Sequence, residues 1–372
     1  MYTKKEYLIH ISLFILTFIT TTLAGAEWLF GKSILASGEH ALTWEYFMKS
    51  IHFSLPFLGI LLIHELGHLL TSLHYKVKTS MPYFIPGWLG FLGAPSLGTF
   101  GAIIKLKSYI NSRRKYFDIG IAGPLAGFVI AFGVLWYGFT HLPEADYIYQ
   151  IHPEYLDPDF KGHTAEEGYM NLEMGYNLLF YGMEKLFADP EKMPNMSEII
   201  HFPYIFAGYL ALFFTALNLL PIGQLDGGHV VFGLFPKHHK QISLAFYIAF
   251  VFYAGLGFLN PYDGFDSLIF SIPLYIGFLY FCFSRSNIMD NQTKWMVIMV
   301  IASVQYALVY AFPTLQGYSG WLFFAFLLGR VMGLEHPEVS GYKSLNTSRK
   351  VLGWICIIIF LICFTPQPFQ IS

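Results

Sequence analysis

Charged residues are scarce in this chain. Asp, Glu, Lys and Arg make up only 12% of its 372 residues, and the formal net charge is −2, whereas a soluble globular protein carries about 25% charged residues. The sequence also lacks a basic tract, which argues against nucleic-acid binding. Its three cysteines lie in apolar segments without metal-ligand spacing. We interpret them as buried side chains rather than disulfides or metal ligands.

Apolar residues, by contrast, are abundant. The chain is 55% hydrophobic and 19% aromatic, and its mean hydropathy is +0.50. Several apolar runs reach the length of about 20 residues that spans a bilayer. The sequence therefore predicts an all-α polytopic membrane protein with about nine transmembrane helices, within a range of about six to ten. The expected spans are 7–27, 47–74, 117–140, 203–222, 243–260, 265–283, 295–312, 318–334 and 350–366.

Basic residues indicate how these spans are oriented. Loops on the cytoplasmic side of a membrane carry an excess of Lys and Arg. With alternating spans, the segment 142–200, which holds twelve acids and three lysines, lies on the outer side. We therefore expect a multi-pass protein of the cell membrane with its N-terminus in the cytoplasm. The basic residues that then fall inside are Lys4, Lys5, Lys76, Lys78, Lys105, Lys107, Arg113, Arg114, Lys115, Lys237, Lys240, Arg285, Lys343, Arg349 and Lys350.

The region 79–106 does not fit a simple span, because prolines and glycines interrupt it and its end shows β-like alternation. We predict a short membrane-dipping β-hairpin here, with an ordinary interfacial loop as the alternative; non-helical backbone at membrane depth requires surrounding protein or a water-filled cavity. The remaining organisation is an N-terminal helix over 1–46, a core over 47–235 that contains the acidic insert 142–200, and C-terminal helices over 236–372.

A polar motif interrupts the second expected span. It reads His64-Glu65-Leu66-Gly67-His68 and lies between apolar residues on both sides. Residues four apart share one face of a helix, so both imidazoles can point at one metal ion. Glu65 is adjacent to the first histidine, where it can reach a water on the metal. Charged groups at the bilayer centre cost about 2.5–3.5 kcal/mol each by insertion scales, so such a cluster indicates a functional site.

A third metal ligand is expected from another apolar segment, because a catalytic zinc usually takes three protein ligands. Asp226 is the best candidate, since it follows Pro221 and Gly223, which favour a break at the end of the fourth span. The predicted topology places this break and the histidine motif at a similar depth, near the cytoplasmic face. His229 is a candidate for orienting the Asp226 carboxylate, and a plain loop histidine is the equally plausible alternative.

Three stretches of the sequence form one set of motifs. They are the motif from His64 to His68, the run from Gly120 to Gly127 in the third span, and the run from Asn218 to His229. In these stretches the chain resembles the site-2 protease family of intramembrane zinc metalloproteases. The resemblance covers at least residues 50–235. Residues 98–103 also look like the plant and cyanobacterial branch of that family, which lacks a metal-binding accessory domain.

The resemblance implies specific roles for residues of the motifs. His64, His68 and Asp226 would hold one zinc ion, and Glu65 would act as the general base. Asn218 matches a family position thought to help hold the substrate or the oxyanion.

The resemblance also implies a substrate class. The partner would be a transmembrane protein in the lipid bilayer, possibly after a prior cleavage, and the reaction would be regulated intramembrane proteolysis. The region 79–106 would offer the substrate an edge strand. One departure is that many bacterial members carry a PDZ domain between the third and fourth core spans, where this chain has only 142–200. The pattern therefore favours a branch without a PDZ domain and puts PDZ-based substrate selection in doubt.

Three alternatives stay open at this level. A membrane metal-ion transporter would also place His, Asp and Glu inside the bilayer, although it would need ligands along several helices. A catalytically inactive scaffold that binds membrane proteins would keep the fold without the reaction. A differently organised HExxH membrane protease would use a Glu as third ligand, but such acids lie mainly in 142–200.

Overall fold

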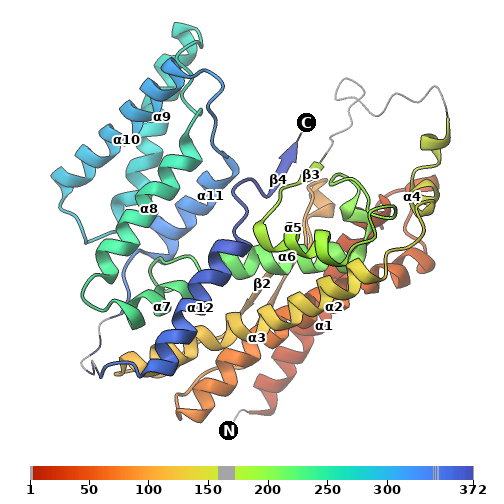
Figure 1. Ribbon diagram of the computed structural model, residues 1–372, viewed down its shortest axis with the longest axis horizontal. Coiled ribbons are helices and arrows are strands. Elements are labelled where there is room, and N and C mark those ends of the chain that lie inside the picture. The colour runs from red at the N-terminus through yellow and green to blue at the C-terminus, as the bar shows by residue number, and fades with distance from the viewer. Residues whose placement is uncertain (1–2, 158–171, 338, 340, 342, 372) are drawn as a thin grey trace. The chain divides into compact units, whose positions relative to one another are not determined.

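The computed structural model describes residues 3–157, 172–337, 339, 341 and 343–371. These residues are mostly helical (Figure 1). The α-helices are α1 (Lys4–Phe30), α2 (Trp44–His74), α3 (Arg113–Thr140), α4 (Tyr147–Ile151), α5 (Leu178–Phe187), α6 (Pro203–Asn218), α7 (Asp226–Leu234), α8 (His239–Gly255), α9 (Phe265–Ser284), α10 (Asn291–Ala311), α11 (Gly320–Phe326) and α12 (Thr347–Cys363).

Short helical turns and strands complete the described fold. The turns are η1 (Gly38–His40), η2 (Gly90–Leu92), η3 (Pro153–Leu156), η5 (Ile199–His201) and the π-helical η6 (Leu327–Met332). The strands are β1 (Tyr83–Gly87), β2 (Gly98–Ile103), β3 (Leu172–Met174) and β4 (Phe369–Ile371).

Five helices in the described part of the chain are long and apolar enough to cross a membrane: α1, α2, α3, α9 and α10. Each coincides with a predicted span to within a few residues. The other four predicted spans also fall on helices, namely α6, α8, α11 with η6, and α12, but none of these is longer than 17 residues. The five candidate spans thus support a helical membrane protein. The expected number of about nine transmembrane helices stays a prediction.

Local sequence signals set the ends of the two N-terminal helices. Thr3 and Glu6 form a reciprocal capping box at the start of α1, and Gly31 ends this helix with a φ of 62°, a conformation that glycine adopts without strain. The Thr43 side chain accepts from the Tyr46 backbone N–H at the start of α2. With 31 residues, α2 is about 46 Å long, enough to cross a bilayer at a tilt.

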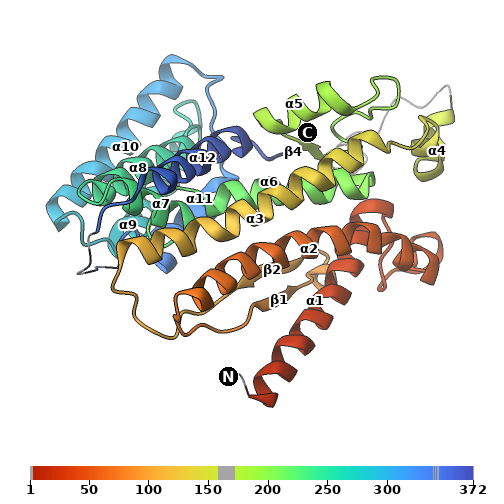
Figure 2. The same ribbon diagram turned by 60° about the horizontal axis from the view of Figure 1, so that its bottom comes forward.

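The chain forms two compact units, and the first comprises residues 1–110, 121–218 and 356–372. In this unit α1 lies beside α2, and α2 also contacts α6 (Figure 2). The antiparallel pair β1–β2 lies along α1, where the Thr20 hydroxyl donates to the Gly98 carbonyl at 2.7 Å. Gly98 has a φ of 74°, and a Cβ there would lie 2.3 Å from the Thr20 carbonyl oxygen.

The β1–β2 pair falls inside the region 79–106 for which a hairpin is predicted. Its register pairs Phe84 with Ala102 and Gly87 with Gly98, with an irregularity between Phe84 and Pro86. Along β1, Phe84 is buried whereas the next residue, Ile85, is 36% exposed, as expected when successive side chains of a strand point to opposite faces. The β pairing is therefore present, while its depth in a membrane stays a prediction.

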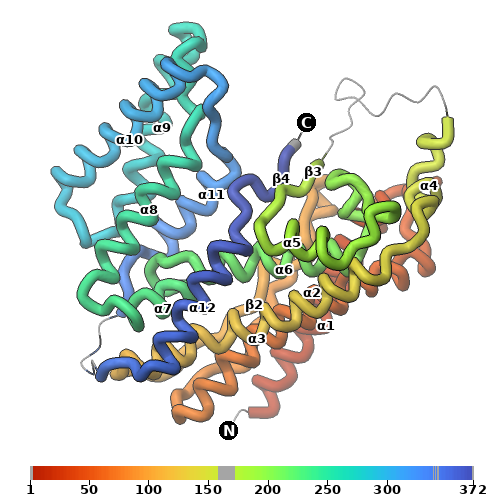
Figure 3. Tube along the Cα trace, viewed as in Figure 1, coloured from red at the N-terminus to blue at the C-terminus, as the bar shows by residue number. Residues whose placement is uncertain are grey.

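A second pair of strands joins distant parts of the first unit. In β3–β4, Leu172 pairs with Ile371 and Met174 with Phe369 (Figure 3). The Tyr209 hydroxyl of α6 donates to the Pro368 carbonyl at 2.8 Å. Residues 158–171 of the insert 142–200 lie outside the described residues.

The second unit comprises residues 111–120 and 219–355, so α3 contributes its first turns here and its remainder to the first unit. Helices α8 and α9 each contact both α10 and α11 (Figure 1), and the Tyr247 hydroxyl donates to the Ala325 carbonyl at 2.8 Å. The Arg349 guanidinium also binds both carboxylate oxygens of Asp118, with nitrogen–oxygen distances of 2.7 and 2.8 Å.

Candidate metal centre

His64 and His68 lie one turn apart on α2, and their imidazoles converge as the motif predicts. The two Nε2 atoms are 3.1 Å apart, and the residues are only 7% and 6% exposed. Two nitrogen ligands 2.0–2.1 Å from a tetrahedral zinc ion lie about 3.3 Å apart. The pair therefore has the separation of two ligands of one metal ion.

Glycines on α2 and α3 bring these helices together around the histidines. A Cβ on Gly123 would lie 2.1 Å from the His68 Nε2 atom, and a Cβ on Gly127 would lie 3.2 Å from the His64 Cβ atom. Across the same contact, a Cβ on Gly67 would lie 2.4 Å from the Ala122 carbonyl oxygen. These small residues let α2 and α3 approach closely, and their packing also determines where the imidazoles can lie.

Two further predicted site residues belong to the same unit. Glu65 is 7% exposed and lies next to His64 on α2. Asn218 is the last residue of α6, and its Nδ2 atom is 3.4 Å from the His64 Nε2 atom. The α2–α6 contact thus brings a side-chain amide beside the histidine pair.

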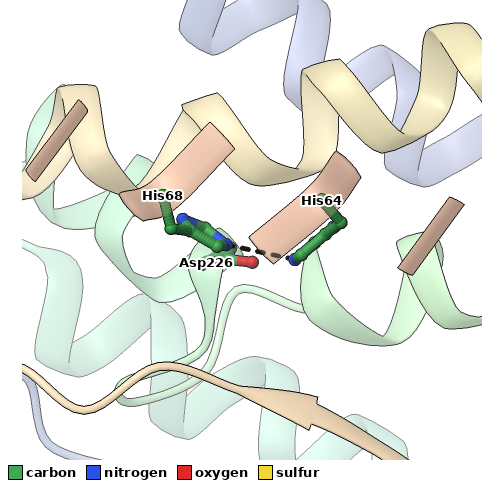
Figure 4. A group of neighbouring side chains, drawn as sticks. All are labelled: His64, His68 and Asp226. Carbon is green, nitrogen blue, oxygen red and sulfur yellow. Dashed lines mark hydrogen bonds between the residues drawn. The ribbon is translucent and has the colours of Figure 1, made fainter. Parts of the chain in front are cut away.

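Asp226 begins α7 in the second unit, directly after the predicted break in the chain. The break is tight: Gly223 has a φ of 53°, and a Cβ on Gly227 would lie 2.0 Å from the Leu219 carbonyl oxygen. Figure 4 shows the Asp226 carboxylate together with the two imidazoles, and the ligand atoms of the three residues lie within 4.8 Å of one another. Two imidazoles and one carboxylate form a donor set that zinc commonly takes.

His229 lies one turn after Asp226 and has a partner that sequence reasoning missed. Its Nδ1 atom is 2.8 Å from the Nε2 atom of His336, and its ring stacks on Tyr116 at 5.3 Å. A Cβ on Gly120 would lie 2.5 Å from the His229 Cβ atom. The sequence gives no signal for the pairing with His336, because the two residues are 107 positions apart.

Burial, together with the neighbouring His229 and His239, lowers the pKa of His336 to about 3, although a hydrogen bond to the Pro337 carbonyl opposes the shift. His336 is 4% exposed, so its imidazole is neutral at pH 7. A neutral ring can accept a hydrogen bond from His229, which fixes the orientation of that histidine.

Comparison with known proteins places these residues in a family context. Residues 52–261 match the model of Peptidase family M50. "Probable zinc metalloprotease EGY1, chloroplastic" from Arabidopsis thaliana is 35% identical over 184 residues, which are 49% of this chain and 29% of that protein. The rice protein of the same name (Oryza sativa subsp. japonica) is 34% identical over 183 residues, 48% of this chain and 27% of that protein.

A further relative, "Probable zinc metalloprotease EGY2, chloroplastic" from Oryza sativa subsp. indica, is 26% identical over 193 residues, 52% of this chain and 31% of that protein. The matched regions thus cover less than one third of the length of these relatives. The family match, in contrast, spans more than half of this chain and includes His64, His68, Asn218 and Asp226. It confirms the resemblance drawn from the motifs: the chain belongs to peptidase family M50.

Proposed function

We propose that this chain is an intramembrane zinc metalloprotease that hydrolyses peptide bonds within or near transmembrane segments of membrane proteins. The observation that carries the proposal is the buried pair of imidazole nitrogens, 3.1 Å apart on a 31-residue apolar helix. Such a pair is costly in a bilayer unless it binds a cation. The family match and the printed names of the relatives support zinc as that cation.

In this proposal His64, His68 and Asp226 hold one zinc ion. When bound, the ion supplies Lewis acidity, which lowers the pKa of water and polarises a peptide carbonyl. Glu65 accepts the proton of the attacking water and passes it to the leaving amide nitrogen, so the carboxylate acts first as base and then as acid.

Asn218 and His229 have supporting roles in the proposal. The Asn218 amide lies 3.4 Å from the His64 Nε2 atom, so its N–H groups can donate to negative charge that develops beside the histidine pair. His229 is held by His336 at 2.8 Å and lies one turn from Asp226, where it can restrict the orientation of the carboxylate.

The substrate is proposed to bind as an extended strand. A transmembrane helix hides its carbonyl groups in hydrogen bonds, so it has to unwind before hydrolysis, and the freed groups need new partners. The β1–β2 sheet has only two strands among the described residues, so strand addition at its edge can supply those partners. The substrate would be a membrane protein, possibly one already trimmed by another protease, selected without a PDZ domain.

The charge distribution supports the proposed cellular placement. The basic loops support a multi-pass protein of the cell membrane with the metal site toward the cytoplasm. The division into a helix over 1–46, a protease core over 47–235 and helices over 236–372 belongs to the same proposal. A transporter or an inactive scaffold has less support, because the described residues combine metal ligands with the adjacent acid that hydrolysis requires.

Cleavage by the purified full chain tests the proposal. The chain is reconstituted with a model transmembrane substrate, and fragments are identified by mass spectrometry. Glu65→Gln should keep its zinc and lose about 10²- to 10⁴-fold in rate. Glu45→Gln is the matched control, because Glu45 is on the same helix but exposed and paired with Lys49.

Three outcomes would overturn the assignments. A Glu65→Gln variant that cleaves at the wild-type rate removes Glu65 as the base. An Asp226→Ala variant with full zinc occupancy and activity removes Asp226 as a ligand. Metal uptake into liposomes without any proteolysis by the wild type would favour the transporter.

A further inference from the structure

A second group of ligand-type side chains lies outside the candidate membrane helices, within the first unit. His152 lies between α4 and η3, Glu198 directly precedes η5, and His201 ends η5. Their three ligand atoms lie within 4.8 Å of one another. His201 is 7% exposed, and the side chains of His152 and Glu198 are 24% and 15% exposed. No step of the proposed proteolysis uses these residues.

Hydrogen bonds fix the tautomer of both imidazoles. The Nδ1 atom of His201 lies 2.7 Å from the Leu29 backbone carbonyl, and the Nδ1 atom of His152 lies 3.0 Å from a Glu154 carboxylate oxygen. Both partners can only accept, so each Nδ1 carries the proton. In the neutral rings the lone pairs therefore lie on Nε2, and these two atoms are 3.1 Å apart.

Glu198 directs a third lone-pair donor at the same point. One carboxylate oxygen accepts from the Tyr155 hydroxyl at 2.9 Å. The other oxygen is buried without a hydrogen-bond partner among the described residues, and it lies 3.6 Å from the His201 Nε2 atom and 3.8 Å from the His152 Nε2 atom. Three atoms with lone pairs thus face one another.

Such an arrangement requires a positive charge at its centre. A proton on one imidazole is one way to supply it, but a single proton can bridge only two of the three facing atoms. A metal ion is the other way. The separations of 3.1, 3.6 and 3.8 Å are close to the edge of about 3.3–3.5 Å of a tetrahedral zinc site.

We propose that His152, Glu198 and His201 bind a second divalent metal ion of the zinc class, with a fourth position open to water. Two imidazoles and a carboxylate suit zinc among the common divalent ions. Histidine ligands of zinc donate their other N–H to a carboxylate or a carbonyl, as His152 does to Glu154 and His201 to Leu29. The ion would join the segment after α4 to the residues before α6.

Zinc stoichiometry of the purified full chain tests this proposal separately from the proteolytic one. Wild type should hold two zinc ions after dialysis, measured by inductively coupled plasma mass spectrometry. Glu198→Gln should hold one, because the amide keeps the size of the side chain and can accept from Tyr155 but is a poor zinc ligand. Asp226→Asn, at the other centre, should also hold one. His40→Ala is the control, since His40 is exposed.

The counts separate the two proposals. If the wild type holds one zinc ion and Glu198→Gln holds none, the result would support the site at Glu198 and contradict the site at Asp226. Zinc content and affinity unchanged in both Glu198→Gln and His152→Ala would overturn the second site. Glu154→Gln keeps all three ligands and should weaken zinc binding there by about 10- to 100-fold. If Glu198→Gln fails to fold, unchanged affinity in Glu154→Gln and a cobalt-loaded Asp226→Asn variant without tetrahedral absorption bands would refute the proposal.

Discussion

Gly123→Ala should displace a metal ligand without unfolding the protein. The added methyl carbon would lie 2.1 Å from the His68 Nε2 atom and 2.5 Å from two ring carbons. Ordinary contact begins at about 3.5 Å, so the ring nitrogen has to move by roughly 1.4 Å. Metal–ligand distances tolerate only about 0.2 Å. We therefore expect the imidazole to leave the metal.

The expected magnitudes separate metal binding from stability. A ligand displaced by about 1 Å costs on the order of 10²-fold in catalysis, and zinc affinity should fall at least as far. Overpacking lowers the free energy of unfolding by about 1–3 kcal/mol, whereas replacing a helical glycine by alanine raises it by about 1 kcal/mol. Because the displaced group is the end of a side chain, unfolding free energy should change by at most about 2 kcal/mol.

The assay compares glycines of the same helix. Zinc affinity is measured by competition with a chelator, and thermal unfolding is followed in the same samples. Gly133→Ala is the matched control, because a Cβ there meets nothing within 4 Å. Gly127→Ala should be intermediate, since its Cβ would lie 3.2 Å from the His64 Cβ atom. Equal zinc affinities in Gly123→Ala, Gly133→Ala and wild type would refute the reasoning.

Three further predictions address the site and its surroundings. Asn218→Ala should keep zinc and reduce kcat by about 10²- to 10³-fold; loss of zinc with unchanged kcat per bound ion would instead make Asn218 a structural residue. The pKa of His336 is lowered to about 3, so the unfolded state binds the extra proton below about pH 6.5 and stability should fall by up to about 1.4 kcal/mol per pH unit on further acidification. Melting temperatures of wild type and His336→Asn between pH 7 and 5 check this, and parallel curves would contradict it. A strong chelator should abolish cleavage, and added zinc should restore it in wild type but not in Asp226→Ala; unaffected cleavage would exclude a metal-dependent reaction.

Much of the helical fold could be predicted from sequence because a bilayer leaves few alternatives. Backbone groups without water have to pair within a helix, so apolar runs of sufficient length become helices. The end of α2 at His74 was predicted to the residue, and its start was missed by three positions because the Thr43 cap precedes the apolar run. The β3–β4 pair was not predicted, since Leu172 and Ile371 have no local pattern that links them.

The candidate site divides in the same way. His64 and His68 follow from helical spacing, and Asp226 follows from the break that Pro221 and Gly223 introduce. Their roles as ligands stay a prediction until metal binding is measured. Contacts set by tertiary structure could not be predicted: only the structure shows that Gly123 lies against His68.

The β3–β4 pair has a consequence for biosynthesis. The first unit is assembled from three separate stretches of chain, the last of which is 356–372, whereas 219–355 of the second unit is synthesised before it. Domains generally fold as units during synthesis, at about 5–20 residues per second. Strand β3 therefore cannot pair with β4 until residues 369–371 have left the ribosome, which happens several seconds or more after β3 itself has emerged. The second unit has that interval to fold first, and a ribosome stalled within 219–355 would leave β3 unpaired.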